Sequence, residues 1–164
     1  MTETGIAVRT KQRGPSGART LSIDIGGTGL KCSVLDASGK MVHDKVWRPT
    51  PHPCPPVTMV NELQAMTEDL PAYDRISAGF PGAVRDGHVI TAPHFPDPEW
   101  SGFDLATALS KVLGKPARVL NDAEVQGYGV ISGHGLEFVL TLGTGAGTAL
   151  FQDCLLYTSP SPRD

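Results

Sequence analysis

The sequence predicts an α/β fold whose mixed sheet opens with an antiparallel meander. Apolar, strand-like segments alternate with segments whose apolar residues recur every three or four positions, as in this class. Two glycine-rich turns, Asp24–Lys31 and Leu142–Gly147, each follow a strand-like run. The residues after the first turn read as a second strand instead of a helix, so the chain doubles back at once.

The meander follows an aperiodic start. Residues 1–20 mix glycine, proline and basic side chains without periodicity, which predicts a flexible leader. Strands are expected over Leu21–Ile25, over Leu30–Asp36 and, after a short turn, over Met41–Trp47. Three consecutive strands with short connections predict the antiparallel meander.

A helix and a strand come next. Residues 49–56 are rich in proline and must be extended. The helix is predicted over Val57–Leu70, and its apolar face carries Met59, Leu63, Met66 and Leu70. The strand is predicted over Arg75–Phe80 and ends at a Pro-Gly pair.

A second helix and a short strand lead to a polar pair. The helix is predicted over Phe103–Leu113, closed by a following glycine and proline. The strand Ala117–Leu120 delivers Asn121 and Asp122 at its carboxyl end, before a helix that starts near Ala123. Ligands of open α/β sheets bind beyond the carboxyl ends of strands, so catalysis is expected at Asp122.

The glycine turns and this polar pair indicate phosphoryl transfer. Glycines let the backbone approach an anion closely and adopt positive φ, so two converging turns could hold a phosphate between their N–H groups. Asp122 would be the base, because an alcohol is a poor nucleophile until its proton is accepted. The first turn fits neither G-x-x-x-x-G-K-[ST] nor G-x-G-x-x-G, so no ordinary nucleotide motif explains it.

Taken in order, these motifs resemble the sugar kinase, Hsp70 and actin superfamily, and within it the ROK (repressor, open reading frame, kinase) family. The resemblance runs from Leu21 to Asp153 and is nearest to the bacterial polyphosphate/ATP glucokinases. It implies a ribonuclease H-like sugar kinase lobe followed by a truncated second lobe. The matching residues are Asp24-Ile-Gly-Gly-Thr-Gly-Leu-Lys31, Phe80-Pro-Gly82, Thr91-Ala92, Trp100-Ser-Gly102, Leu120-Asn-Asp-Ala123 and Leu140-Thr-Leu-Gly-Thr-Gly-Ala-Gly147.

The resemblance implies a role for each site residue. Asp122 would be the catalytic base, and Asn121, Asp122 and Gly82 would bind the sugar. Asp24 would hold Mg²⁺ through water, since this ion prefers oxygen ligands and retains waters. The phosphate would be bound by both glycine turns, through Gly26, Gly27, Thr28 and Lys31 in the first and through Gly143, Thr144 and Gly145 in the second.

Structural explanations for the same residues stay open. Asp122 could be a helix N-cap, and Asn121 a turn residue in the left-handed region. Asp24 could be a buried structural aspartate and Lys31 an ordinary surface lysine. Residues 143–145 could form a plain tight turn between strands.

Two aromatic residues bear on the sugar pocket. Trp100 could form a wall of the pocket or belong to the core. His94 stands where the ROK family has an asparagine that touches the sugar, which alters the polar contacts of the pocket. The five histidines have no ligand spacing, so the sequence predicts no metal site built from them.

The implied activity is phosphorylation of glucose at the 6-hydroxyl, with polyphosphate or ATP as donor and Mg²⁺ as cofactor. The alternatives are an ATP-dependent kinase of another hexose, a ROK-type sugar-responsive transcriptional regulator and an Hsp70/actin-like ATPase. A regulator would carry an N-terminal helix-turn-helix of about 60 residues or more. About twenty residues precede the first strand here.

The expected organisation is that of a fragment. A leader over 1–20 precedes an N-terminal lobe over 21–130 and the start of a second lobe over 131–153. Residues 154–164 resemble a translated sequencing adapter and are expected to be non-native. The parent enzyme is expected to be a homodimer, and the fragment alone is expected to be inactive.

Composition excludes some partners. The formal net charge of −3 gives no global attraction to nucleic acid. The sequence has no signal-peptide pattern and no apolar run of the ~18 residues that a membrane span needs. Three cysteines without ligand spacing are read as free thiols in a reducing cytoplasm.

Overall fold

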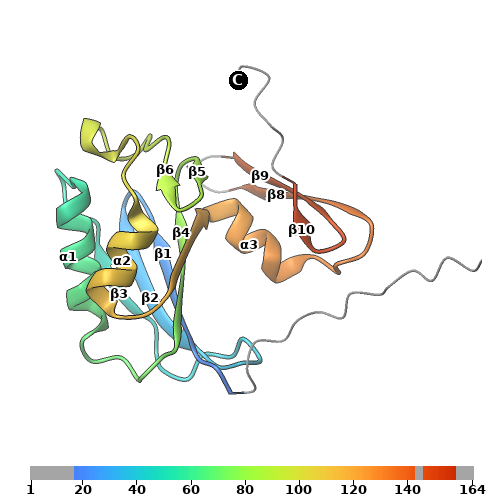
Figure 1. Cartoon of the computed structure of the whole chain (residues 1–164), viewed down its shortest axis with the longest axis horizontal. Coiled ribbons are helices and arrows are strands. Elements are labelled where there is room, and N and C mark those ends of the chain that lie inside the picture. Colours follow the sequence, from blue (N-terminus) through green and yellow to red (C-terminus); the bar gives the residue numbers. More distant parts are fainter. Residues whose placement is uncertain (1–16, 143–145, 158–164) are drawn as a thin grey trace, which may run out of the picture.

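The computed structural model describes residues 17–142 and 146–157 of the chain. Its main feature is a five-stranded mixed sheet with the order β3-β2-β1-β4-β7, and a three-stranded sheet with the order β10-β9-β8 lies beyond helix α3 (Figure 1). The predicted α/β class and the antiparallel meander are confirmed.

The meander consists of β1 (Thr20–Ile25), β2 (Gly29–Leu35) and β3 (Val46–Pro49), which pair antiparallel in that order. The prediction that the third strand starts at Met41 is wrong. Met41 forms only an isolated bridge to Leu35, and continuous pairing begins at Val46. Residues 41–45 are exposed, so no packing holds them on the sheet, whereas Val46 packs against the core.

The other half of the sheet is parallel. Strand β4 (Arg75–Phe80) pairs with β1 on one side and with β7 (Ala117–Asn121) on the other. The carboxyl ends of β1, β4 and β7 therefore lie at the same edge of the sheet. The residues that follow these three strands are brought together there.

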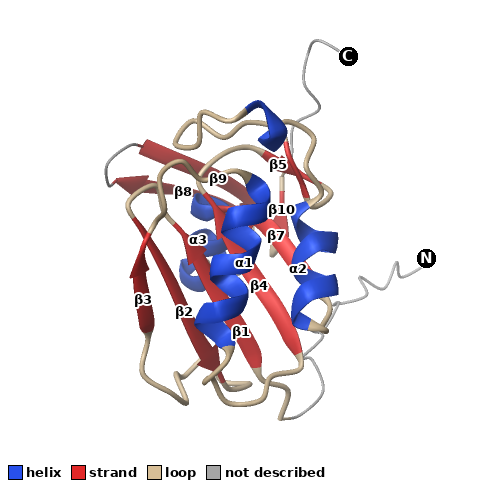
Figure 2. Cartoon of the chain, turned by 90° about the vertical axis from the view of Figure 1, so that its left-hand side faces the viewer, coloured by secondary structure: helices blue, strands red, loops and turns tan. Residues whose placement is uncertain are grey.

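Helices α1 (Pro56–Thr67) and α2 (Leu105–Leu113) cover one face of the sheet (Figure 2). Helix α2 begins later than predicted because the Asp104 carboxylate caps it, accepting the Thr107 N–H at 2.9 Å. Helix α1 ends before Leu70, which is only partly buried. Buried apolar residues fill the layer between sheet and helices: Leu21, Ile23, Ile25, Met59, Leu63, Met66, Ile76, Ala78, Leu105 and Leu109.

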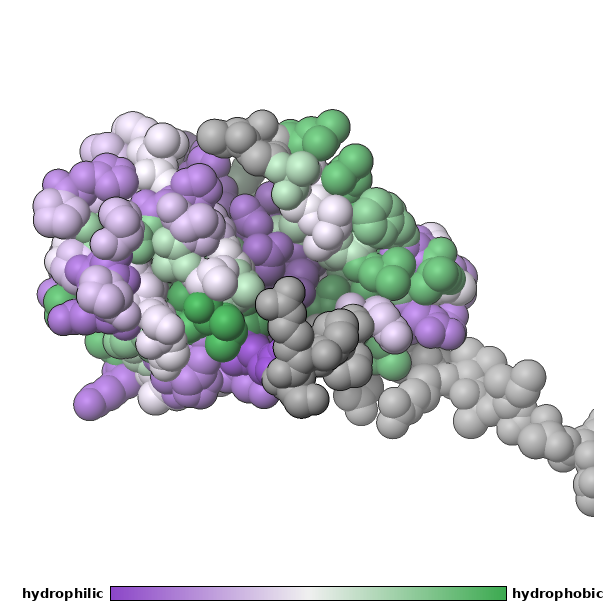
Figure 3. Space-filling model, turned by 90° about the horizontal axis from the view of Figure 1, so that it is seen from above, coloured by the Kyte–Doolittle hydropathy of each residue, from purple (hydrophilic) through white to green (hydrophobic). Residues whose placement is uncertain are grey.

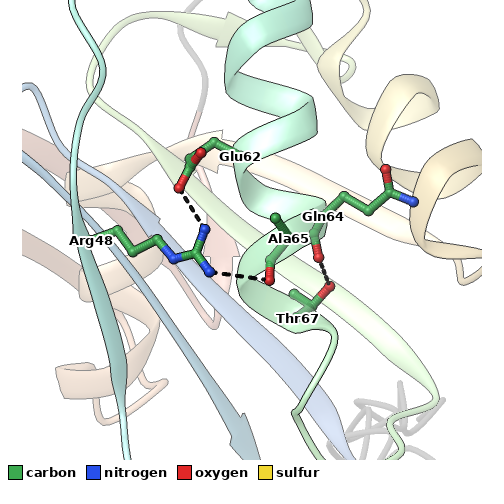
Figure 4. A network of polar contacts seen from close by, with 5 residues as sticks. All are labelled: Arg48, Glu62, Gln64, Ala65 and Thr67. Carbon is green, nitrogen blue, oxygen red and sulfur yellow. Dashed lines mark hydrogen bonds and ion pairs between the residues drawn. The ribbon is translucent and has the colours of Figure 1, made fainter.

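Arg48 ties the edge strand β3 to α1. Its guanidinium donates to Glu62 Oε1 at 2.8 Å and to the carbonyl of Ala65 at 3.5 Å (Figure 4). Both charged side chains are partly exposed, so the pair contributes less than about 1 kcal/mol. The two contacts link β3 to the middle of α1.

The connection from β4 to α2 carries an aromatic cluster. It contains the short hairpin β5 (Val84–Arg85) and β6 (His88–Val89) and the 3₁₀ turn η1 (Pro98–Trp100), none of which the sequence predicted. Trp100 is 1% exposed, and its Nε1–H donates to the Cys54 carbonyl at 2.9 Å. Its ring packs against Phe80, Phe95 and Phe103. Trp100 is therefore a core residue and does not form a wall of a pocket.

Helix α3 (Asp122–Val130) lies between the two sheets (Figure 1). The second sheet consists of β8 (Leu136–Leu142), β9 (Ala146–Gln152) and β10 (Leu155–Leu156), all antiparallel. Gly127 permits the contact between helix and sheet, because a Cβ there would lie 2.5 Å from a ring atom of Phe151. The Tyr128 ring meets the same phenylalanine edge-on.

The outer face of β8, the edge strand of the second sheet, is apolar. Side chains alternate along β8, and all four outward residues are large, apolar and 53–78% exposed: Leu136, Phe138, Leu140 and Leu142. Figure 3 shows this hydrophobic area on the right of the molecule, over β8 and β9. In the described ranges, 17–142 and 146–157, no helix combines the length and the hydropathy that crossing a bilayer requires.

Two glycines of α3 provide a test of this packing. Gly127→Ala should lower the free energy of unfolding by about 1–3 kcal/mol, because the new methyl group overlaps the Phe151 ring. Gly129→Ala is the matched control: its Cβ would meet no atom within 4 Å, so the helix should gain about 0.5–1 kcal/mol. Urea denaturation of both variants measures the difference. Equal effects would contradict the packing described for α3.

Candidate active site at the carboxyl edge of the sheet

The predicted site residues converge at the carboxyl edge of the five-stranded sheet. The first glycine turn follows β1, Gly82 follows β4, and Asn121 ends β7. Asn121 Nδ2 donates to the carbonyl of Gly82 at 3.0 Å. Gly79 lies under the start of α3, where a Cβ on it would be 3.4 Å from Cα of Asp122. The parallel strand order thus gathers residues that are nearly a hundred positions apart.

The first glycine turn needs its glycines for space. None of Gly26, Gly27 and Gly29 has φ in the left-handed region, so the expected positive φ is wrong for this turn. A Cβ on Gly26 would lie 2.7 Å from the carbonyl oxygen of Gly29, and one on Gly29 would lie 2.5 Å from Nε1 of Trp47. Thr28, between these glycines, is exposed.

His94 lies against this turn. A Cβ on Gly27 would be 3.0 Å from Cβ and Cγ of His94, so the exposed imidazole packs on the glycine. His52 approaches the same residue, with Nε2 3.0 Å from the Gly27 carbonyl. That two histidines meet at the turn was not predicted, because both come from loops distant from it in the chain.

Asp24 and Lys31 face each other across β1 and β2. They are register partners, and Lys31 Nζ lies 2.8 Å from Asp24 Oδ2. The Asp24 side chain is 50% exposed, so it is not a buried structural aspartate, and Lys31 is paired instead of free in solvent. Asp24 points away from the buried face that carries Leu21, Ile23 and Ile25.

Asn121, and not Asp122, is the N-cap of α3. Its φ of −60° and ψ of 147° are extended, so it is not a left-handed turn residue. Its Oδ1 accepts the N–H of Ala123 at 2.9 Å, while Glu124 Oε2 accepts the N–H of Asn121 at 3.1 Å. This reciprocal capping box was missed from the sequence, although the Asn-x-x-Glu spacing is its signature.

Asp122 is the first residue of α3. Its Oδ1 accepts the N–H of Ala123 at 2.8 Å. Oδ2 receives no hydrogen bond from any residue that the structure describes. The side chain is half-buried, and the positive end of the helix dipole favours its negative charge.

Gly82 is required by a backbone contact. A Cβ on it would overlap the carbonyl oxygen of Thr91, which is backbone and cannot move aside. The hydroxyl of Thr91 accepts the N–H of Ala83 at 2.9 Å, which fixes the loop after β4. A side chain at position 82 would therefore displace the loop whose carbonyl accepts the hydrogen bond from Asn121.

The second glycine turn can be located only by its flanks. Gly143, Thr144 and Gly145 lie outside the described residues. Next to them, Gly147 of β9 packs on α3, where a Cβ would lie 2.7 Å from Cβ of Ala123. The start of β9 is thus adjacent to the start of α3.

Asp24 is the carboxylate predicted to hold a magnesium ion. No group of three or more His, Cys, Asp or Glu residues is arranged to hold a metal within residues 17–142 and 146–157. Mg²⁺ keeps several waters and is commonly held by one or two carboxylates together with substrate phosphates. The half-exposed Asp24 fits that mode of binding and does not fit a cage made by protein alone.

Glu124 gives the site a pH dependence that can be measured. Burial raises the pKa of its carboxyl above the ordinary value of 4.5, against the opposing hydrogen bond from Asn121. A raised folded-state pKa means that the stability linked to this group is complete below the unfolded value and is lost as pH rises through the folded value.

Glu124→Gln keeps the cap and removes the titration. The free energy of unfolding of this variant, relative to the wild type, should therefore increase between about pH 4 and about pH 7. Glu68→Gln, at an exposed position after α1, is the control and should show no such trend. Denaturation curves across this range would contradict the assignment if the Glu124→Gln difference stayed constant.

Comparison with known proteins places this chain in a family. The model of the ROK family matches residues 20–161. N-acetylmannosamine kinase of Escherichia coli K12 is 30% identical over 150 residues, which cover 86% of this chain and 50% of that protein. The chain thus spans about half the length of the curated relatives it matches.

Two solved structures are similar over most of the chain. The inorganic polyphosphate/ATP-glucomannokinase of Arthrobacter sp. strain KM has a TM-score of 0.76 and 30% identity, over 87% of this chain and 62% of that one. A ROK family glucokinase of Streptomyces griseus, in complex with glucose and AMPPNP, has a TM-score of 0.73 and 26% identity, over 87% and 47%. The chain belongs to the ROK family, and these three relatives are sugar kinases.

Proposed function

We propose that the protein containing this chain phosphorylates glucose at the 6-hydroxyl, with polyphosphate or ATP as the phosphate donor. Membership of the ROK family and the likeness to a polyphosphate/ATP-glucomannokinase and a glucokinase support this. Within the proposal, residues 21–130 form the first lobe and residues 131–153 begin a second, with a leader before them and a non-native tail after them. The substrate and the donor would lie between the two lobes.

The observation that best supports the proposal is the Oδ2 atom of Asp122. Oδ1 is engaged by the N–H of Ala123, whereas Oδ2 has no donor among the described residues. A carboxylate oxygen in this state can accept the proton of a sugar hydroxyl as that hydroxyl attacks the phosphate. Such general-base catalysis contributes typically ~10²–10⁴ in rate.

Asn121 and Gly82 would orient the sugar. The amide of Asn121 uses one N–H toward Gly82 and one lone pair toward Ala123. An amide has two donors and two lone pairs, so one of each is left for a pair of sugar hydroxyls. The cap fixes the side chain, so the sugar would meet a group that is already oriented.

The first glycine turn would bind the donor through its backbone. The N–H groups of Gly27 and Thr28 have no acceptor among the described residues. The remaining phosphate contacts would come from Lys31, at the end of the first turn, and from the second turn, through Gly143, Thr144 and Gly145. Mg²⁺ bound through Asp24 would supply positive charge to the donor phosphates, and phosphoryl transfer depends mainly on such positioning and charge.

The sugar, the compartment and the assembly are further parts of the proposal. Glucose is favoured over N-acetylmannosamine because one of the structural relatives named above is a glucomannokinase and the other is a glucokinase in complex with glucose. A cytoplasmic enzyme is in keeping with free thiols, and burial raises the pKa of Cys32 to about 12. We propose a homodimer for the whole enzyme.

Asp122→Asn tests the assignment of the base. In a protein extended to the length of its relatives, this change should leave glucose affinity within about tenfold and lower kcat by ~10²-fold or more, because shape is kept and the proton acceptor is lost. Asp69→Asn, at an exposed position after α1, is the control and should keep full activity. Glucose 6-phosphate formation with each donor is the assay, and near-normal turnover of Asp122→Asn would return this residue to a structural role.

Salt dependence separates the two donors. Polyphosphate is a long polyanion that should contact several cations, so its apparent affinity should fall steeply between ~50 and ~300 mM salt. ATP, held by two turns and one Mg²⁺, should respond less. The donor KM values across this range measure the difference. Equal slopes, or no turnover with polyphosphate, would leave an ATP-dependent sugar kinase.

A further inference from the structure

We propose that Thr50 and His52, in the loop after β3, are positioning residues that hold the first glycine turn in its phosphate-binding form. This inference rests on the proposed function, because it concerns how the turn binds the donor. It assigns a role to two residues that belong to neither glycine motif nor to the Asn-Asp pair.

Three hydrogen bonds connect this loop to consecutive carbonyl groups of the turn. The Thr50 hydroxyl donates to the Gly26 carbonyl at 2.6 Å, and the Thr50 N–H donates to the Thr28 carbonyl at 3.2 Å. Between them, Nε2 of His52 lies 3.0 Å from the Gly27 carbonyl. A carbonyl oxygen only accepts, so Nε2 carries the hydrogen in this contact. All three carbonyls of residues 26–28 are therefore engaged from one segment.

The remaining groups of the turn are N–H donors. The N–H of Gly26 donates to the carbonyl of Gly29 at 3.0 Å and closes the hairpin. The N–H groups of Gly27 and Thr28 have no acceptor in the part of the chain that the structure describes. Donors without partners attract an anion, whereas free carbonyl oxygens would repel it. Because the loop engages the three carbonyl oxygens, the groups that the turn presents to a ligand are the N–H groups of Gly27 and Thr28.

The burial of Thr50 makes this arrangement rigid. Thr50 is 6% exposed although its side chain is polar, and its hydroxyl donates to the Gly26 carbonyl of the turn. On the other side, the His94 ring packs against Gly27. The turn is thus fixed before any donor arrives, and preorganised donors bind an anion without a cost of reorganisation.

The test is a titration of this chain with inorganic tripolyphosphate, followed by the ¹⁵N and ¹H shifts of the Gly27 and Thr28 amides. In the wild type these two amides should shift and saturate together. Thr50→Val removes the hydroxyl while keeping the shape, and should weaken the apparent affinity by about fivefold, the effect of one hydrogen bond. Thr50→Ser restores the hydroxyl and should bind within about twofold of the wild type.

Two further variants make the result specific. Thr58→Val makes the same change on α1, away from the turn, and should leave the affinity unaltered. His52→Phe changes an exposed residue and removes the bond to Gly27, so it should weaken binding even if Thr50→Val does not fold. Thermal unfolding of each variant separates stability from affinity, because a purely structural role would lower the Tm and leave the affinity unchanged.

The outcomes distinguish this inference from the proposed function. If the wild type binds and Thr50→Val and His52→Phe bind equally well, the positioning role is wrong while the phosphate site stands. If neither amide of the wild type shifts, both the positioning role and the phosphate assignment of the turn are wrong. The Asp122→Asn assay of turnover is independent of either result.

Discussion

The parallel pairing of β1, β4 and β7 is the constraint on which the site depends. Because β4 runs parallel to both neighbours, the three strands end at the same edge of the sheet. The glycine turn, Gly82 and Asn121 follow those ends directly, so no loop has to be long to bring them together. A single reversed strand would place one of the three groups at the opposite edge. The order and direction of the strands therefore determine where the site lies, and the side chains determine what it can bind.

The regular elements were predictable where apolar periodicity was long and bounded. Strand β4 matches the predicted Arg75–Phe80, because its run ends at proline. The start of β3 was not predictable, because Met41 forms only an isolated bridge and continuous pairing begins at Val46, which packs against the core. The β5–β6 hairpin was missed although its turn residues, Asp86 and Gly87, are the local signal of a two-residue hairpin and both have positive φ. Two-residue strands carry no periodicity to recognise.

The location of the site could be predicted from the sequence, but the structural roles of the individual residues in it could not. The order strand, Asn121, Asp122, helix is visible in the sequence. Which of the two residues caps α3 depends on a one-residue shift of the helix start, and on the reach of Glu124 back to Asn121. The glycines of the first turn were expected to serve positive φ, whereas they make room for neighbouring groups. Thr50 escaped notice because it lies 24 residues from the carbonyl that its hydroxyl contacts.

The apolar outer face of β8 has a consequence for how the chain matures. Every strand of the five-stranded sheet lies within residues 20–121, so that sheet can be completed while later residues are still being synthesised. The β8–β9 hairpin emerges afterwards with Leu136, Phe138, Leu140 and Leu142 exposed on an edge strand. Until these side chains are covered, the nascent chain exposes a hydrophobic surface. Such surfaces are bound by chaperones and favour association with other nascent chains. The five-stranded sheet can thus fold before the β8–β9 hairpin is made, and the apolar side chains of β8 have to be covered in a later, separate step.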